Sequence, residues 1–316
     1  MPSKKLKMLG ICLALLCVCW AAIFMVQVIR AKVLVSSGNW PQSFLTLRER
    51  NVIFKAVGDE PFAKAAPVLV RALVEFRPDF YWLNRSGDTP WDEKRYTNGQ
   101  KNYVLAQTLW EAHLARPVDP AKADILVGLL RTAQRAEEKT MLIYALSNNN
   151  WTPAAVPLLA AIAADPHETL AARSCAINAL LRHDDINRHM PRAIEIALAS
   201  PIILERVLIF DGITTDVDPG NTPLNQESRD RLVSAGFEIL MALQEKDWRG
   251  GGYFIAGKLG ALLGGENNFH PNKKDPKYKQ GKGGGLTEAY YTDSVRNALA
   301  WNQARMNSVV SPPSTR

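Results

Sequence analysis

The residues best suited to catalysis are three consecutive polar side chains, His183, Asp184 and Asp185. A His-Asp pair is typical of metal-dependent phosphohydrolases, whose metal ions need further histidine or carboxylate ligands from separate helices. No spacing among the other histidines supplies such ligands. The triplet also falls where Asn148–Asn150 stands in an earlier copy of a repeated segment, so we interpret it as a solvated turn between helices. The other histidines are His113, His167, His189 and His270.

The glycine triplet at residues 250–252 is a second candidate, because backbone amides before a helix can hold a phosphate. The preceding strand and flanking lysine of such loops are missing, so we interpret the triplet as a helix break. Common metalloprotease, serine-hydrolase and P-loop motifs are also missing from the sequence. The sequence therefore predicts no catalytic, cofactor or metal site and favours a non-catalytic protein. The alternative is an enzyme of lyase or hydrolase type with its site near residues 77–100 or 249–285.

An irregular aromatic loop is expected over residues 77–100, where turn-forming residues interrupt the helical pattern. Long loops inside a compact array often carry function, and aromatic rings with polar tips suit protein interfaces. The loop is therefore a candidate partner contact, and the alternative is that its rings cover the end of the helix stack. The candidate contact residues are Tyr81, Trp82, Trp91 and Tyr96.

A lysine-rich segment is expected to be either a solvated flexible linker or a surface that attracts anionic lipid or an acidic partner. The chain has a net charge of +7, but residues 1–32 and 269–316 each carry +5 and the middle carries −3. A nucleic-acid binder concentrates basic residues on its folded face, so no nucleic-acid partner is predicted. No small-molecule substrate is evident either. The lysines of the candidate surface are Lys273, Lys274, Lys277, Lys279 and Lys282.

Residues 8–29 form an apolar run without a charged side chain, about 33 Å long as a helix. This length spans a hydrocarbon core of about 30 Å and exceeds the roughly 7–15 apolar residues of a cleavable signal peptide. We therefore expect a single-pass transmembrane helix in contact with the lipid bilayer. Three lysines precede the run and two cations follow it, which favours the N-terminus inside and an extracytoplasmic C-terminal domain.

Two segments of the chain repeat each other at a spacing of 34 residues. Apolar residues at helical spacing with a fixed period of this size indicate stacked helical hairpins. A more divergent copy precedes them over residues 101–136. The pattern Lys139-x-x-Leu142-x-x-Ala145-Leu146 recurs as Arg173-x-x-Ala176-x-x-Ala179-Leu180, Pro157 recurs as Pro191, and Ile162-Ala163 recurs as Ile196-Ala197.

The motif Arg173-x-x-Ala176-x-x-Ala179-Leu180 resembles the first helix of the HEAT-like repeats in the armadillo-type superhelical family. The resemblance is clearest over residues 137–200 and extends more loosely over 41–136. It implies an all-α fold, a right-handed α-solenoid of HEAT-like helical hairpins, and usually a protein-binding scaffold. It carries over no active site.

The expected layout begins with a membrane segment and ends in a helical cap. The leading hypothesis is a membrane-anchored scaffold or adaptor that binds a protein partner through the concave face of the solenoid or the aromatic loop. A further alternative is a structural envelope component that packs against lipid or cell wall through its basic tail. The expected segments are a basic tail (1–7), a transmembrane helix (8–29), a linker (30–40), the solenoid (41–248, with helices over 62–76 and 226–248), a degenerate helical cap (249–306) containing a basic Gly/Lys linker (264–285), and a flexible tail (307–316).

Overall fold

The computed structural model describes residues 4–76, 98–115, 120–216, 223–265, 269–280 and 285–310. Helices make up nearly all of this described part, so the predicted all-helical fold is confirmed there, apart from one pair of two-residue strands. The chain divides into two compact units, Met1–Thr152 and Pro153–Arg316. Each unit is described by itself below.

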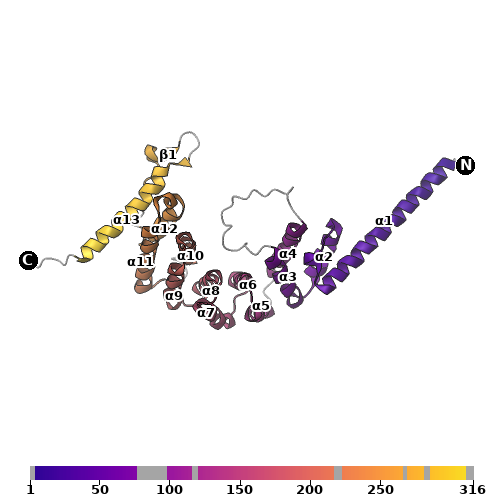
Figure 1. Ribbon diagram of the computed structural model, residues 1–316, viewed down its shortest axis with the longest axis horizontal. Helices are drawn as coiled ribbons and strands as arrows, with labels where there is room; N and C mark the ends of the chain where they lie inside the picture. Colours follow the sequence, from indigo (N-terminus) through magenta and orange to yellow (C-terminus); the bar gives the residue numbers. More distant parts are fainter. Residues whose placement is uncertain are drawn as a thin grey trace, which may run out of the picture. The chain divides into compact units, whose positions relative to one another are not determined.

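The first unit is built on a long N-terminal helix and shorter helices that follow it (Figure 1). The helix α2 packs on α1, α3 packs on α4, and α6 packs on α3, α4 and α5. Trp40, 1% exposed, is among the largest fully buried side chains of this unit. The elements are α1 (Lys4–Ser37), η1 (Trp40–Gln42), α2 (Leu47–Asp59), α3 (Phe62–Phe76), α4 (Asn98–Ala115), α5 (Pro120–Thr132) and α6 (Ala136–Asn149).

The second unit is a succession of helices in which each packs on its neighbours in sequence (Figure 1). The helix α8 packs on α7 and α9, α10 packs on α8 and α9, and α11 packs on α9, α10 and α12. The helices are α7 (Val156–Ala164), α8 (Leu170–His183), α9 (Ile186–Ala199), α10 (Ile203–Asp216), α11 (Gln226–Ala242), α12 (Tyr253–Leu262) and α13 (Glu288–Val310), with the short turns η3 (Pro153–Ala155), η4 (Glu245–Asp247), η5 (Trp248–Gly252) and η6 (Pro276–Tyr278).

The small and apolar side chains at the repeated sequence positions are buried in both segments, apart from the exposed Pro157 and Pro191. On the first helices α6 and α8 the repeated small and apolar positions are at most 1% exposed, and on the second helices α7 and α9 they are at most 6% exposed. Burial of the same face in each copy explains why the spacing recurs, since a hairpin must cover its apolar stripe with a neighbour. These positions are Leu142, Ala145, Leu146, Ala176, Ala179, Leu180, Ile162, Ala163, Ile196 and Ala197.

The N-terminal helix extends beyond the expected membrane segment. It continues to Ser37, so most of the expected linker over residues 30–40 is helical. The helix continues because nothing breaks it before Gly38, whose φ of 69° is easily adopted only by glycine. Ser36 and Ser37 do not break it, because their hydroxyl groups donate to carbonyl oxygens one turn earlier in the same helix.

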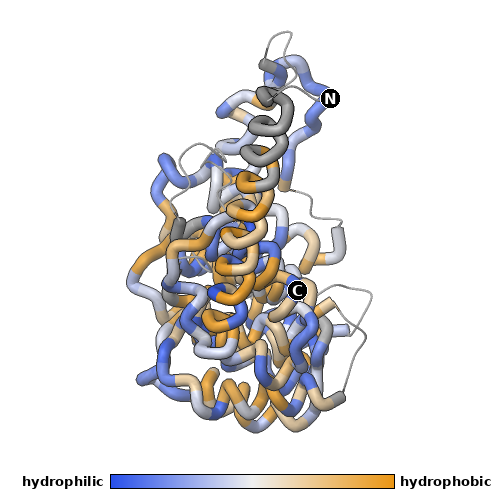
Figure 2. Tube along the Cα trace, turned by 90° about the vertical axis from the view of Figure 1, so that its right-hand side faces the viewer, coloured by the Kyte–Doolittle hydropathy of each residue, from blue (hydrophilic) through white to orange (hydrophobic). Residues whose placement is uncertain are grey.

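One helix in the described part of the chain is long and apolar enough to cross a membrane, over Leu15–Ser37. Its hydrophobic residues form an extended run in Figure 2. From Leu15 to Val26 its side chains are exposed, whereas Ala31 is completely buried against the rest of the unit. The helix therefore has an uncovered N-terminal part and a C-terminal part that packs on protein.

The division between the compact units lies between Thr152 and Pro153, so α6 and α7 belong to different units. One expected helix end differs from the structure. The expected helix over 226–248 ends at Ala242, where Leu243 takes an extended conformation. The apolar periodicity of the sequence gives no sign that the helix ends at Ala242, because Leu243 is itself apolar and buried.

The glycine triplet lies in the π-helical turn η5 that leads directly into α12, so it is not the expected helix break. A Cβ atom on Gly251 would lie 3.2 Å from Val207 Cγ2, and one on Gly252 would lie 2.9 Å from Val295 Cγ2. These two glycines therefore allow α10 and α13 to approach the turn closely.

The basic segment over 264–285 also has more structure than a flexible linker. It contains η6 and the antiparallel strands β1 (Lys279–Gln280) and β2 (Gly285–Leu286). Asp275 caps η6 by accepting from the Lys277 amide, and Tyr278 is buried. A buried aromatic ring thus fixes the part of the segment that carries the lysines.

Candidate functional site

Some of the residues predicted to contact a partner lie outside the part of the chain that the structure describes. The aromatic residues Tyr81, Trp82, Trp91 and Tyr96 fall in this class, and so does Lys282. Their proposed roles stay predictions. The other four lysines of the candidate surface are described, and all four are exposed: Lys273, Lys274, Lys277 and Lys279.

Lys277 is held in place by its neighbours. Its Nζ lies 3.4 Å from Asp293 Oδ2 on α13 and 4.4 Å from the centre of the Tyr278 ring. The Tyr278 hydroxyl donates to the same carboxylate at 2.8 Å. Lys273, Lys274 and Lys279 make no ion pair within the described residues, so their charges face solvent.

An aromatic cluster lies beside these lysines, where α12, the loop after it and α13 meet. The His270 ring stacks on Tyr253 with a centroid distance of 4.4 Å, and Tyr291 packs edge-on against Tyr253 at 5.1 Å. Burial, followed by the charge of Lys273, lowers the pKa of His270. Burial, followed by the neighbouring Tyr253, raises the pKa of Tyr290 to about 12. Both shifts favour the neutral form near neutral pH, so neither ring brings a charge to the cluster.

The His183 triplet has structural roles in the hairpin of α8 and α9. Asp184 Oδ2 lies 2.8 Å from His189 Nε2, and Asp185 caps α9 by accepting from the backbone amides of Asn187 and Arg188. Within the described residues no three histidine, cysteine or acidic side chains are grouped so that they could hold a metal ion. Both aspartates therefore use their carboxylates to hold the turn.

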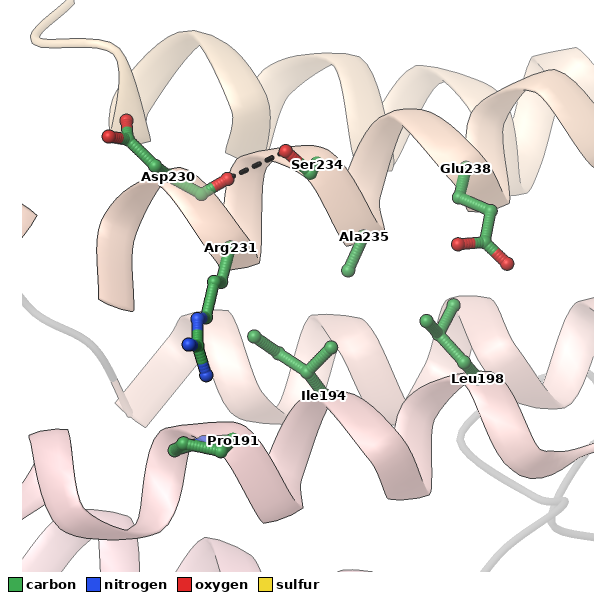
Figure 3. Close-up of a pocket in the computed structure, with 8 residues that line it drawn as sticks. All are labelled: Pro191, Ile194, Leu198, Asp230, Arg231, Ser234, Ala235 and Glu238. Atoms are coloured by element: carbon green, nitrogen blue, oxygen red, sulfur yellow. Dashed lines mark hydrogen bonds between the residues drawn. The ribbon is translucent and has the colours of Figure 1, made fainter. Parts of the chain in front are cut away.

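An open, shallow groove of about 420 Å³ lies between α9 and α11 on the second unit (Figure 3). Its floor is apolar: Ile194 and Leu198 point from α9 toward α11, and Ala235 points back between them. Pro191 extends this floor at the N-terminal side of α9. The helices α9 and α11 pack on each other and are separated in sequence by α10.

Charged side chains of α11 flank this apolar floor. Asp230 and Glu238 are both exposed and eight residues apart, which is about 12 Å along a helix. Asp230 accepts a hydrogen bond from Gln226 at 2.9 Å, and Glu238 lies 4.0 Å from Arg206. Arg231 also lines the groove, but its charge is compensated by Glu227 at 2.6 Å. In Figure 3 the Glu238 carboxylate lies near Leu198 at one end of the apolar strip, the Arg231 guanidinium lies over Pro191 at the other end, and the Asp230 carboxylate points away from α9.

Sequence reasoning missed this groove. Asp230, Ser234 and Glu238 recur at four-residue spacing and have the pattern of an ordinary solvent face of a helix. The one signal in the sequence was the position of α9 as the second helix of a clear repeat, since second helices of neighbouring hairpins lie side by side in a stack.

Comparison of the chain with protein-family models, with curated proteins and with solved structures finds no match.

Proposed function

We propose that this protein is a membrane-anchored α-solenoid of HEAT-like hairpins that acts as a non-catalytic scaffold and binds a segment of a protein partner in the α9–α11 groove. The observation that carries the proposal is the apolar floor of Ile194, Leu198 and Ala235, bordered by exposed polar side chains of α11. Apolar centres with polar rims are typical of protein interfaces.

The groove chemistry selects the kind of segment that would bind. An apolar side chain would sit against Ile194 and Leu198, which lie one helical turn apart. A basic side chain of the partner would face Glu238 at the Leu198 end of the strip. An amphipathic helix with a basic residue beside its apolar face meets both conditions, and helices of this kind commonly bind in apolar grooves.

Site-specific photocrosslinking in native membranes tests the proposal. A photoreactive phenylalanine analogue at Ser234 is expected to capture a protein whose crosslinked peptide carries apolar and basic residues. The same analogue at Leu204, an exposed apolar residue of α10, is the matched control and should not capture it. Equal capture from both positions, or a crosslinked peptide without basic residues, would contradict the proposal.

Charge reversal distinguishes specific binding in the groove from non-specific adsorption to the protein surface. Glu238→Lys is expected to lower crosslinking from Ser234 at least roughly tenfold, because it places a like charge opposite the basic residue of the partner. Glu238 is exposed, so the fold should tolerate the change. The control, Glu111→Lys with Asp124→Lys, reverses two exposed acids of the first unit and should leave capture unchanged.

A second candidate contact is the aromatic cluster with its lysines. Lys273 and Lys274 are exposed and make no ion pair among the described residues, beside the Tyr253–His270 stack. Tyrosine rings and exposed cations together suit an acidic protein segment. Crosslinking from Phe254, 57% exposed next to this stack, is expected to give a product that Lys273→Gln with Lys274→Gln removes. A product that persists in the double variant would exclude the lysines as the contact.

A further inference from the structure

The helix α1 is exposed on all sides only up to Val26, whereas beyond it Ile29 and Val33 stay exposed on one face. Side chains from Leu15 to Val26 are exposed, and from Gln27 onward one face of the helix is covered by α2 and η1. The apolar run that begins at Met8 in the sequence therefore has 19 residues before the protein body begins, or about 28 Å of helix. This length matches a hydrocarbon core of about 30 Å. The covered positions recur at helical spacing: Gln27, Val28, Ala31, Leu34 and Val35.

The first residues of α2 lie against this boundary. The Arg48 guanidinium lies 5.1 Å from the Trp20 ring centre and 4.9 Å from the Phe24 ring centre, and its Nη1 donates to Gln27 Oε1 at 3.4 Å. Trp20 lies about 9 Å of helix before Val26, so the rings that Arg48 contacts are on the hydrocarbon side of this boundary. Arg48 also contacts Gln27, and a long arginine side chain can reach outward to lipid phosphates, so the start of α2 is near the level where the bilayer would end.

Two large apolar side chains are exposed at the same place. Phe44 is 68% exposed and Leu47 is 73% exposed, although each is next to well-ordered contacts. The Phe44 carbonyl accepts from Arg30 Nη2 at 3.1 Å, and Leu47 is the first residue of α2 and precedes Arg48. A group of apolar side chains with flanking arginines is the composition of surfaces that lie in a membrane interface.

We propose that Phe44 and Leu47 insert into the bilayer interface while Arg48 binds lipid phosphates, so that the start of α2 seats the first unit on the membrane. The occupant of this surface is the bilayer because the surface is continuous with the membrane-crossing part of α1. Seating would hold the unit at the membrane surface, whereas a flexible linker would leave it free to move away. The inference rests on the membrane anchor of the proposed function.

Spin-label accessibility in reconstituted vesicles tests this seat. The full-length protein, with its four cysteines replaced by alanine, would carry one nitroxide label and be reconstituted in vesicles of phosphatidylcholine with a minority of phosphatidylglycerol. A label at Leu47→Cys is expected to collide more with oxygen than with a water-soluble nickel chelate. A label at Lys55→Cys, an exposed position of the same helix, is the matched control and should favour the nickel chelate.

A third label distinguishes failure of the seat from failure of the anchor. Val18→Cys, on the uncovered part of α1, should report the depth of the hydrocarbon core. If Val18 is deep and Leu47 is as accessible to nickel as Lys55, the seat is wrong and the anchor stands. If Val18 itself is accessible to nickel, both the anchor and the seat are wrong.

Discussion

Arg30 Nη1 donates to Glu49 Oε1 at 2.7 Å and so ties α1 to α2. Glu49 is 1% exposed, and its second oxygen, Oε2, accepts from the Thr46 amide at 2.7 Å and from the Thr46 hydroxyl at 2.9 Å. Burial acts to raise the pKa of Glu49, but the hydrogen bonds from Thr46 and Arg30 outweigh it, and the pKa is lowered. One carboxylate therefore caps α2 and joins it to α1.

Replacing this carboxylate should loosen the junction. Glu49→Gln is expected to lower the free energy of unfolding by about 2 kcal/mol, since an amide cannot accept the same set of bonds and leaves buried donors unpaired. Denaturant unfolding in detergent micelles, followed by circular dichroism, measures it. Asp59→Asn, at the exposed end of α2, is the control and should change stability by less than about 0.5 kcal/mol. Equal effects would show that the Glu49 contacts contribute nothing specific.

The same junction predicts a dependence on acid. The folded pKa of Glu49 lies below its unfolded value of 4.5. The contribution of ionised Glu49 to the free energy of unfolding is therefore complete above about pH 4.5, and it is lost as the pH falls through the folded pKa. The Glu49→Gln variant should lack this part of the acid dependence. Unfolding midpoints of both proteins between pH 3 and 6 (roughly the window set by this linkage) would converge at the acid end; parallel curves would refute the assignment.

Replacing each of two helix-interior glycines by alanine should change the stability of the protein in opposite directions. A Cβ on Gly236 in α11 would lie 2.7 Å from Phe210 Cζ and 2.8 Å from Leu259 Cδ2, and both side chains are fully buried. Gly236→Ala should therefore destabilise the protein by about 1–3 kcal/mol. A Cβ on Gly128 in α5 would meet no atom within 4 Å outside its own helix, so Gly128→Ala should stabilise by about 0.5–1 kcal/mol. Thermal unfolding of the two variants measures the contrast, and a stabilising Gly236→Ala would contradict the close packing.

A helix could be predicted from the sequence where the residues that determine its ends and its buried face lie within its own segment. Helix α3 begins and ends at the expected residues Phe62 and Phe76, because a proline start and a strong apolar period lie within its own segment. The turn at Asp184 and Asp185 was likewise predictable, since aspartate before a helix is a common cap. The expectation of an apolar anchor also agrees with α1.

Features that depend on tertiary packing could not be predicted in the same way. The glycine triplet has the composition of a helix break, but Val207 and Val295 pack where its side chains would be, and η5 runs on into α12. The α9–α11 groove depends on which helices become neighbours, and its rim residue Glu238 is indistinguishable in sequence from any solvated residue. Both features arise from contacts between distant segments.

His270 should make the second unit sensitive to mild acid. Burial and the charge of Lys273 lower its folded pKa below the unfolded value of 6.5, so protonation favours unfolding. The contribution of the neutral His270 ring to the free energy of unfolding is complete above about pH 6.5, and it is lost as the pH falls toward the folded pKa. His270→Gln should flatten this part of the stability profile, and Lys273→Gln should weaken it. Thermal unfolding between pH 5 and 8, about the range in which histidine titrates, measures this dependence. The control is His167→Gln, which replaces an exposed histidine. If His270→Gln keeps the wild-type dependence of the unfolding temperature on pH, the prediction is wrong.

Membrane orientation can be read from two labelled positions. Three lysines and the amino terminus precede the apolar run and favour the N-terminus inside, although α2 brings Arg48 to the other flank and narrows the charge difference. In a background with all native cysteines replaced by alanine, Lys55→Cys should react with a membrane-impermeant maleimide in intact cells. Ser3→Cys should react only after permeabilisation. The reverse pattern would overturn the orientation and leave the membrane seat intact, because Phe44, Leu47 and Arg48 would meet the opposite leaflet with the same chemistry.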